Sequence, residues 1–320
     1  MATMEQTRGI QGYTQEHQYH GEAHVLSGEL KRPIQQKIEE QAPVSLKSLR
    51  GAHLTRYAEN VSIEGLISFK AGYTRVSGSR GVKHNGWITL TTSIVEGLNI
   101  FEVITADRVV SQVSTDHPYD KGHVPRVTFL GTQFTNLKIG GYPLDLKLNL
   151  DLCGEKPEND RSYVSDLRFL SSVREEVNRV ATSHDLPKAL SPKYHGRLGE
   201  IDTLIHNSSH EDPIGAVTCS LVKSIDISGI PIPGLKTVGN LLMIPDFGVV
   251  AIGEVEVGTK AAEPPDGPRS RNPETEDSLR NGGGRPTNYF RLNMLQMELG
   301  CIGHGSANVA VAYSNGHHKP

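Results

Sequence analysis

The chain has 320 residues, enough for one large domain or two ordinary ones, each with a core of its own. Its formal net charge of −3 and its pI of about 6.5 give no electrostatic reason to expect a nucleic-acid partner. Hydrophobic residues make up only 36% of the chain and there are 33 glycines, which is typical of a turn-rich protein with many short elements.

Location and cofactors can be addressed only by what the sequence lacks. No stretch approaches the roughly 20 apolar residues of a membrane-spanning helix, so we expect no membrane span. The first residues lack the apolar core of a secretory signal, which predicts a cytoplasmic protein, with non-Sec export to the surface as the alternative. The scattered Cys153, Cys219 and Cys301 predict small buried thiols without a disulfide framework. We expect no cofactor.

Strand patterns run through both halves of the chain. Residues 86–95 and 99–115 are rich in β-branched side chains, and residues 144–152 alternate strictly between leucine and polar residues. In residues 290–299 the apolar positions change parity between Met294 and Leu295. Such a change exchanges the two faces of a strand, and it predicts a bulge or a sharp bend at this point.

One segment has the periodicity of a helix. Residues 165–187 place apolar side chains three and four residues apart, with Ser165 as the expected N-cap and Pro187 as the stop. The sequence then predicts a mainly β fold of two related antiparallel units, sandwich or barrel-like, with one amphipathic α-helix between them. The expected divisions are an N-terminal strand-bearing segment 1–60, a first unit 61–160, a helix and linker 161–195, and a second unit 196–320 with a flexible loop 260–288.

Two octets of nearly the same pattern occur in the two halves, LKIGGYPL at 137–144 and IDISGIPI at 225–232. Each has a glycine that permits a turn and a proline that fixes φ just after it. Neither contains a nucleophile, a pair of carboxylates or a histidine. We therefore interpret the repeat as a turn kept in each of two related β-units, with no catalytic role.

The stretches VEGLNIFEVITADRVVSQVSTDH, VTFLGTQFTNLKIGGYPLDL, IPDFGVVAIGEVEV and NYFRLNMLQMELGCIGHGSANVAVAY resemble the β-domain of bacterial choice-of-anchor surface proteins. The resemblance covers roughly residues 95–150 and 215–314, about half of the chain. It implies an all-β protein with a surface or assembly role, and it brings no catalytic residues with it. The sequence departs from that pattern because it has neither a signal peptide nor an anchor.

The sharpest candidate for chemistry is HGEAH, with His20, Glu22 and His24. Alternate residues of a strand share a face, so two imidazoles and a carboxylate would point the same way, as ligands of zinc or iron do. His17 stands nearby as a possible fourth ligand. The alternative is that these side chains are simply the polar face of an edge strand.

Two further histidine-containing segments deserve the same comparison. STDHPYDKGHVPR holds Asp116, His117, Asp120 and His123, which could form an acid–base pair but are also typical of a solvated hairpin loop. CIGHGS, residues 301–306, places a histidine three residues after Cys301, although its glycines favour a tight turn. The C-terminal NGHHKP reads as a solvated tail.

Three functions are compatible with these features. The favoured one is a non-catalytic β-protein that assembles with itself into a homo-oligomer, shell, fibre or surface component, because no convincing active-site set is present. The second is a metal-dependent, cupin-like enzyme that uses His20, Glu22 and His24. The third is a β-barrel or sandwich that binds an apolar small ligand or a glycan, although an aromatic content of 6% makes a stacking surface for a glycan poor.

Overall fold

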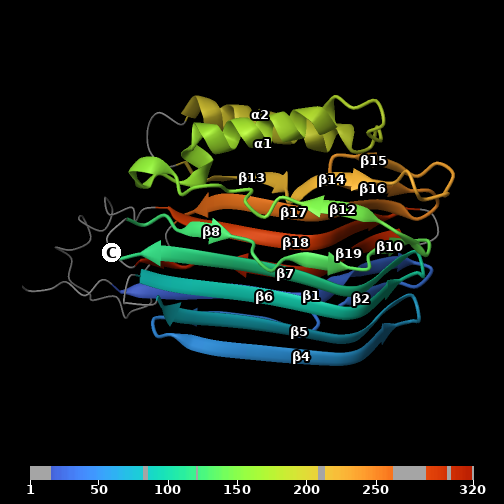
Figure 1. Ribbon diagram of the computed structural model, residues 1–320, viewed down its shortest axis with the longest axis horizontal. Helices are drawn as coiled ribbons and strands as arrows, with labels where there is room; N and C mark the ends of the chain where they lie inside the picture. The colour runs from blue at the N-terminus through green and yellow to red at the C-terminus, as the bar shows by residue number, and fades with distance from the viewer. Residues whose placement is uncertain are drawn as a thin grey trace, which may run out of the picture.

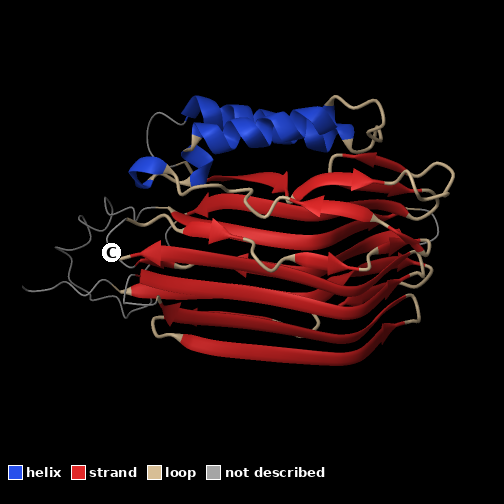
Figure 2. Ribbon diagram, viewed as in Figure 1, coloured by secondary structure: helices blue, strands red, loops and turns tan. Residues whose placement is uncertain are grey.

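The chain folds into two large antiparallel sheets packed face to face, with a pair of helices along one side (Figures 1 and 2). The computed structural model describes residues 16–81, 86–119, 122–207, 213–261, 286–300 and 304–318. Within these residues both sheets stay open, so the predicted mainly β fold of two antiparallel units is confirmed as a sandwich.

The first sheet is built from both ends of the chain, because its N-terminal strand pairs with a strand near the C-terminus. Its strand path is β15-β16-β17-β18-β19-β1-β2, with β13, β3 and β20 paired alongside. The strands are β1 (His17–Arg32), β2 (Gln36–Ile38), β3 (Val44–Ser48), β13 (Gly215–Ser220), β15 (Lys236–Val238), β16 (Leu241–Ile244), β17 (Gly248–Lys260), β18 (Thr287–Leu299), β19 (His304–Ser314) and β20 (His317–His318).

The second sheet is continuous in sequence and follows the path β11-β10-β7-β6-β5-β4, with β8 and β9 paired to β7. Its strands are β4 (Ala52–Ile63), β5 (Ile67–Arg80), β6 (Gly86–Ile100), β7 (Ile104–Pro118), β8 (Arg126–Thr128), β9 (Gln133–Thr135), β10 (Lys138–Ile139) and β11 (Tyr142–Pro143). A separate two-stranded ladder joins β12 (Asp145–Leu148) to β14 (Val222–Asp226). Most of the predicted loop 260–288 lies outside the described residues.

Neighbouring strands of the first sheet exchange their inner and outer faces at positions that lie side by side across the sheet. We call this line of positions the transverse row. Met294 and Leu295 are both buried, at 0% and 1% exposure, which confirms the change of parity predicted there. The pairing of β18 keeps the same register on both sides, so no residue has been added to the strand. Instead its neighbours bend, with Gly253 in β17 at φ 60° and Ala310 in β19 at φ 53°.

The second sheet carries a similar row, in which Asn60 of β4 has φ 52° and Gly97 of β6 has φ 64°. The left-handed residues fall on alternate strands, as they do in the first sheet. The bend near one end of strands β4 to β7 is visible in Figure 1.

Two helices, not one, connect the β-units. Helix α1 (Leu167–Ala181) is the predicted one, but its N-cap is Asp166, whose carboxylate accepts from the N–H groups of Arg168 and Phe169. Ser165 instead lies in a short 3₁₀ turn, Tyr163–Ser165, and shares a hydrogen bond with Ser162; a second such turn is Glu158–Asp160.

The sequence predicts a single helix, so α2 (Ser191–Asn207) is a correction: it begins in the predicted linker, which ends at residue 195, and continues into the predicted second unit. Pro192 lies in the first turn, where a proline is tolerated. Tyr194, Ile201 and Leu204 then supply a buried face, and tertiary packing outweighs the low helix propensity of Gly196 and Gly199.

The repeated octets do form turns, as predicted, but of different kinds. The first is a two-residue hairpin between β10 and β11, with Gly140 at φ 57° and Gly141 at φ 86°. In the second, the N–H of Ser228 binds the carboxylate of Asp226. The two turns meet in space, because β12 pairs with β14 and Gly140 lies against Ile232.

Candidate functional site

The predicted metal ligands lie on the outer face of the first sheet. His20, Glu22 and His24 share that face of β1, as period two requires, whereas Tyr19, Gly21 and Ala23 point into the sandwich. His17 also belongs to the inner set, with 2% exposure, so it lies on the wrong face to be their fourth ligand.

These three outer side chains form two separate polar pairs. His20 Nε2 lies 3.1 Å from Glu22 Oε1, and this bond holds the pKa of Glu22 below its usual value. His24 shares a hydrogen bond with Ser27 at 2.9 Å and lies 3.5 Å from Glu40. Among the described residues, no three His, Cys, Asp or Glu side chains are arranged as they stand to hold a metal ion.

The same face forms a shallow polar groove across four strands. Glu22 is paired in register with Tyr313, Tyr313 with Arg291, and Arg291 with Glu256. The Arg291 guanidinium lies 5.7 Å from the Tyr313 ring centre. Tyr289 donates to Glu256 at 2.6 Å, and its burial together with that bond raises its pKa. Among the described residues that line it, the groove has charges of both signs and no Cys or Ser nucleophile.

The second predicted segment is placed differently from the expected loop. Strand β7 continues through Pro118, and His117 is paired with Trp87 of β6, so Asp116 and His117 lie in a strand. His117 is completely buried between the sheets. Partial desolvation raises the pKa of Asp116, whose side chain lies on the opposite face of β7 from His117. Asp120 lies outside the described residues.

His117 belongs to a cluster of imidazole rings inside one end of the sandwich. The ring centres of His17, His117 and His318 are 4.7, 5.1 and 5.4 Å apart. The ring centre of His123 lies 5.6 Å from that of His318, and Trp87 stacks on His17 at 5.3 Å. Four segments that are distant in sequence therefore contribute aromatic rings to one cluster.

Three of these rings are held in their neutral form. Burial lowers the pKa of His17 from 6.5 to about 3, and it lowers the pKa of His117 well below 6.5. For His318 burial lowers the pKa to about 4, aided by His123 and opposed by Asp160 and the Gly122 carbonyl. The cluster is thus a set of neutral imidazoles, each with one nitrogen lone pair, in surroundings that largely exclude water.

The C-terminal histidines correct the prediction of a solvated tail. His317 and His318 form β20, which pairs with the start of β1, and His318 is 5% exposed. A two-residue strand after Gly316 is too short to show a periodic pattern, so it could not be predicted from the sequence. Cys301 lies outside the described residues, and His304 is exposed at the start of β19. Cys153 and Cys219 are buried free thiols, as predicted.

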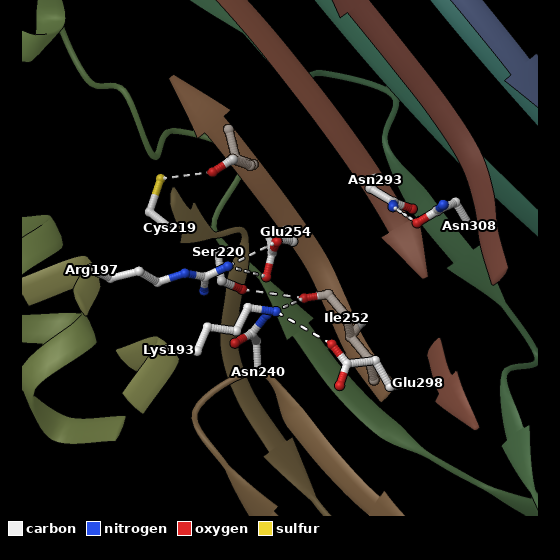
Figure 3. Close-up of polar contacts among 11 residues, drawn as sticks. Lys193, Arg197, Cys219, Ser220, Asn240, Ile252, Glu254, Asn293, Glu298 and Asn308 are labelled. Carbon is white, nitrogen blue, oxygen red and sulfur yellow. Dashed lines mark hydrogen bonds and ion pairs between the residues drawn. The ribbon is translucent and has the colours of Figure 1, made fainter. Parts of the chain in front are cut away.

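A second polar cluster joins the helices to the first sheet (Figure 3). Arg197 of α2 donates to both carboxylate oxygens of Glu254 in β17, at 3.2 Å each, and both side chains are about 15% exposed or less. Ser220 and Asn240 donate to the carbonyl of Ile252. These contacts satisfy backbone groups where β17 bends and fix α2 on the sheet.

Glu176 of α1 lies within the same junction. Burial raises its pKa from 4.5 to about 7, against the lowering effects of Arg179, Arg197 and the backbone of Ser220. Tyr194 is also buried there, with its pKa raised to about 12, and Arg197 lies 5.0 Å from its ring centre. The cavity beside Tyr194 and Glu254 measures about 20 Å³, which is room for about one water molecule, so we interpret the junction as structural.

A family model described as "Domain of unknown function (DUF8256)" matches residues 17–258. The chain belongs to the DUF8256 family. The DUF8256 match begins at the first residue of β1 and ends inside β17, so it includes the second sheet and both helices but not His318. No curated protein and no solved structure matched the chain. The resemblance to choice-of-anchor surface proteins stays a prediction.

Helices of the described ranges are also too short or too polar to cross a membrane.

Proposed function

We propose that this chain is a non-catalytic β-protein that assembles with copies of itself through the open edge of β4. The observation that carries the proposal is the contrast between the two ends of the sandwich. At one end the helices lie over β13, and at the other end the second sheet stops at β4, as in Figure 1.

Strand β4 has the properties of a pairing edge. It is 12 residues long, and among the described residues its ladder is made with β5 alone. Residues on an edge strand point alternate N–H and C=O groups away from the sheet, where another strand can bind them. A strand of this length is well above the usual 5 to 6 residues.

The side chains of β4 favour a second copy as the partner. The strand contains no proline or lysine, the residues that most often block edges. Its two formal charges, Arg56 and Glu59, have opposite signs. Two antiparallel copies of β4 therefore do not face each other with charges of one sign only. Tyr57 is 71% exposed and offers a large apolar contact. The left-handed Asn60 bends the strand, which favours residues 52–58 for pairing.

The test compares two surface tyrosines at opposite edges of the second sheet. Tyr57 lies on β4, and Tyr142, which is 42% exposed, lies on β11. Light scattering and sedimentation velocity of the full chain are measured over a wide concentration range for wild type, Tyr57→Lys and Tyr142→Lys. We expect a defined oligomer or larger assembly for wild type and Tyr142→Lys, and a shift to monomer for Tyr57→Lys, because an edge lysine opposes strand pairing.

A wild-type chain that stays monomeric at every concentration would overturn the proposal. Assembly of Tyr57→Lys at the wild-type level would overturn the assignment of β4. The metal-enzyme alternative with His20, Glu22 and His24 makes a different demand, because it needs metal bound in the outer groove.

A further inference from the structure

We propose that His17, His117 and His318 bind one divalent metal ion of the kind that imidazole ligands prefer, such as Zn²⁺ or Co²⁺. The site joins the beginning of β1, the end of β7 and the C-terminal strand β20. It is separate from the outer groove and from the β4 edge, and it does not depend on self-assembly.

The spacing of the three rings matches that of a three-histidine site. Zn–N bonds of about 2.0–2.1 Å at tetrahedral angles place ligand nitrogens roughly 3.3 Å apart and imidazole centres roughly 5 Å apart. The Nδ1 atoms of His17 and His318 are 3.3 Å apart. The three ring centres are separated by 4.7, 5.1 and 5.4 Å.

Four ring nitrogens of the cluster are buried without a hydrogen-bond partner. His117 is fully buried, and neither of its ring nitrogens has a hydrogen bond. The Nε2 atoms of His17 and His318 are buried without a partner as well. Each neutral imidazole carries one N–H and one free lone pair, so a single contact between two Nδ1 atoms cannot satisfy three rings. An ion bound by one nitrogen of each ring gives His117 a partner and replaces the Nδ1–Nδ1 contact, and the Nε2 atoms of His17 and His318 then carry their N–H groups.

The surroundings suit a metal ion. Neutral imidazole is the form that coordinates, and burial keeps these rings neutral. Trp87 and Tyr19 pack against His17 and keep water away from it. Asp160 lies near His318 as an outer carboxylate, and it is held by the N–H groups of His123 and Val124.

Binding requires only a local rearrangement. The three side chains do not yet converge on one point, as the absence of a ready-made metal group among the described residues indicates. Nδ1 of His17 and of His318 already face each other, so rotation of the His117 ring toward them completes the set. The ion would then fasten the C-terminal strand to both sheets.

The experiment uses the full chain stripped of metal by a chelator. Zn²⁺ is titrated calorimetrically, Co²⁺ is added to read its visible spectrum, and the unfolding temperature is measured with and without Zn²⁺. We expect one equivalent of Zn²⁺, a tetrahedral Co²⁺ spectrum without thiolate bands, and a higher unfolding temperature with Zn²⁺.

Variants separate this site from the outer groove. His117→Phe keeps a ring of similar size and removes both nitrogens, and we expect Zn²⁺ affinity to fall at least about 100-fold, with loss of the thermal shift. The double variant His20→Ala, His24→Ala removes the groove imidazoles, and we expect it to bind Zn²⁺ as wild type does. His318→Phe serves as the second ligand variant should His117→Phe fail to fold.

Three results would overturn the proposal. The first is wild-type protein that takes up no more than trace Zn²⁺ and Co²⁺, which would leave ordered water as the partner of these nitrogens. The second is unchanged Zn²⁺ affinity in the ligand variants. The third is loss of binding in the groove variant alone, which would move the metal to His20 and His24.

Discussion

The two ends of the sandwich are finished in different ways. At the covered end, two helices are fixed to the first sheet by the buried Arg197–Glu254 pair and by apolar residues such as Leu170, which is completely buried. At the open end, β4 has mostly exposed or half-exposed side chains and one neighbouring strand. The protein uses about forty residues to close one end of the fold and none of the described residues to close the other.

This difference shows which end of the fold is stabilised by the chain's own helices and which end is left for a second chain to cover. Substitutions at the covered end are expected to change the free energy of unfolding. Substitutions at the open end are expected to change association and to leave the folded monomer nearly as stable as before.

The largest expected effect is at the helix–sheet junction. Arg197→Ala leaves the carboxylate of Glu254 buried without its partner, so we expect the free energy of unfolding to fall by about 3 to 5 kcal/mol. Denaturant unfolding measures the change. Arg174→Ala is the matched control, because Arg174 and Asp202 also form an ion pair of the helical layer, between α1 and α2, but their side chains are 47% and 43% exposed. Equal losses in the two variants would contradict the importance given to burial.

The next effect depends on pH. Glu176 has its pKa raised to about 7 by burial, so the folded state favours the protonated acid, whereas the unfolded chain ionises near pH 4.5. Its contribution to stability is therefore complete below pH 4.5 and is lost as pH rises to about 7, by about 3 kcal/mol. Glu176→Gln stays neutral and can still accept from the Ser220 backbone.

We expect Glu176→Gln to gain stability relative to wild type between pH 4.5 and pH 8, measured by denaturant unfolding at several pH values. Glu175→Gln, an exposed neighbour on the same helix, should show no such trend. A difference between Glu176→Gln and wild type that is constant over this pH range would contradict the burial of an acid at this junction.

A smaller effect is expected in the transverse row. Gly253 has φ 60°, and a methyl group there would meet Leu221 at an ordinary 3.4 Å. Gly253→Ala therefore tests backbone strain with little steric clash, and we expect a loss of about 1 kcal/mol in thermal or denaturant unfolding. Gly300→Ala has similar room, with its nearest atom at 3.5 Å, and lacks the left-handed backbone. The same loss in both variants would show that the row is not strained.

The sequence predicted those parts of the fold in which a regular pattern of apolar residues extends over many positions. The face exchange at Met294 and Leu295 was visible because six apolar residues surround it, and α1 was visible through its regular spacing. Helix α2 was missed because Pro192, Gly196 and Gly199 hide a helix that packing stabilises. The order of strands, in which β1 joins β19, is set by contacts between distant residues that no local pattern contains.

The candidate sites divide in the same way. The sequence pointed to His20, Glu22 and His24 because they are neighbours in one strand. In the structure His20 pairs with Glu22, whereas His24 pairs with Glu40. The imidazole cluster was missed because His17, His117 and His318 are about a hundred or more residues apart. Parity alone could have placed His17 inside the sandwich, since it shares its face with Tyr19 and Ala23.

The central claim, that β4 is an edge completed by a second copy, is tested most directly by amide hydrogen exchange at low and high protein concentration. We expect residues 52–58 to gain protection as concentration rises, while β13, which is covered by the helices of its own chain, keeps the same exchange rates. Exchange in residues 52–58 that is identical at both concentrations, in a sample that does assemble, would contradict the claim.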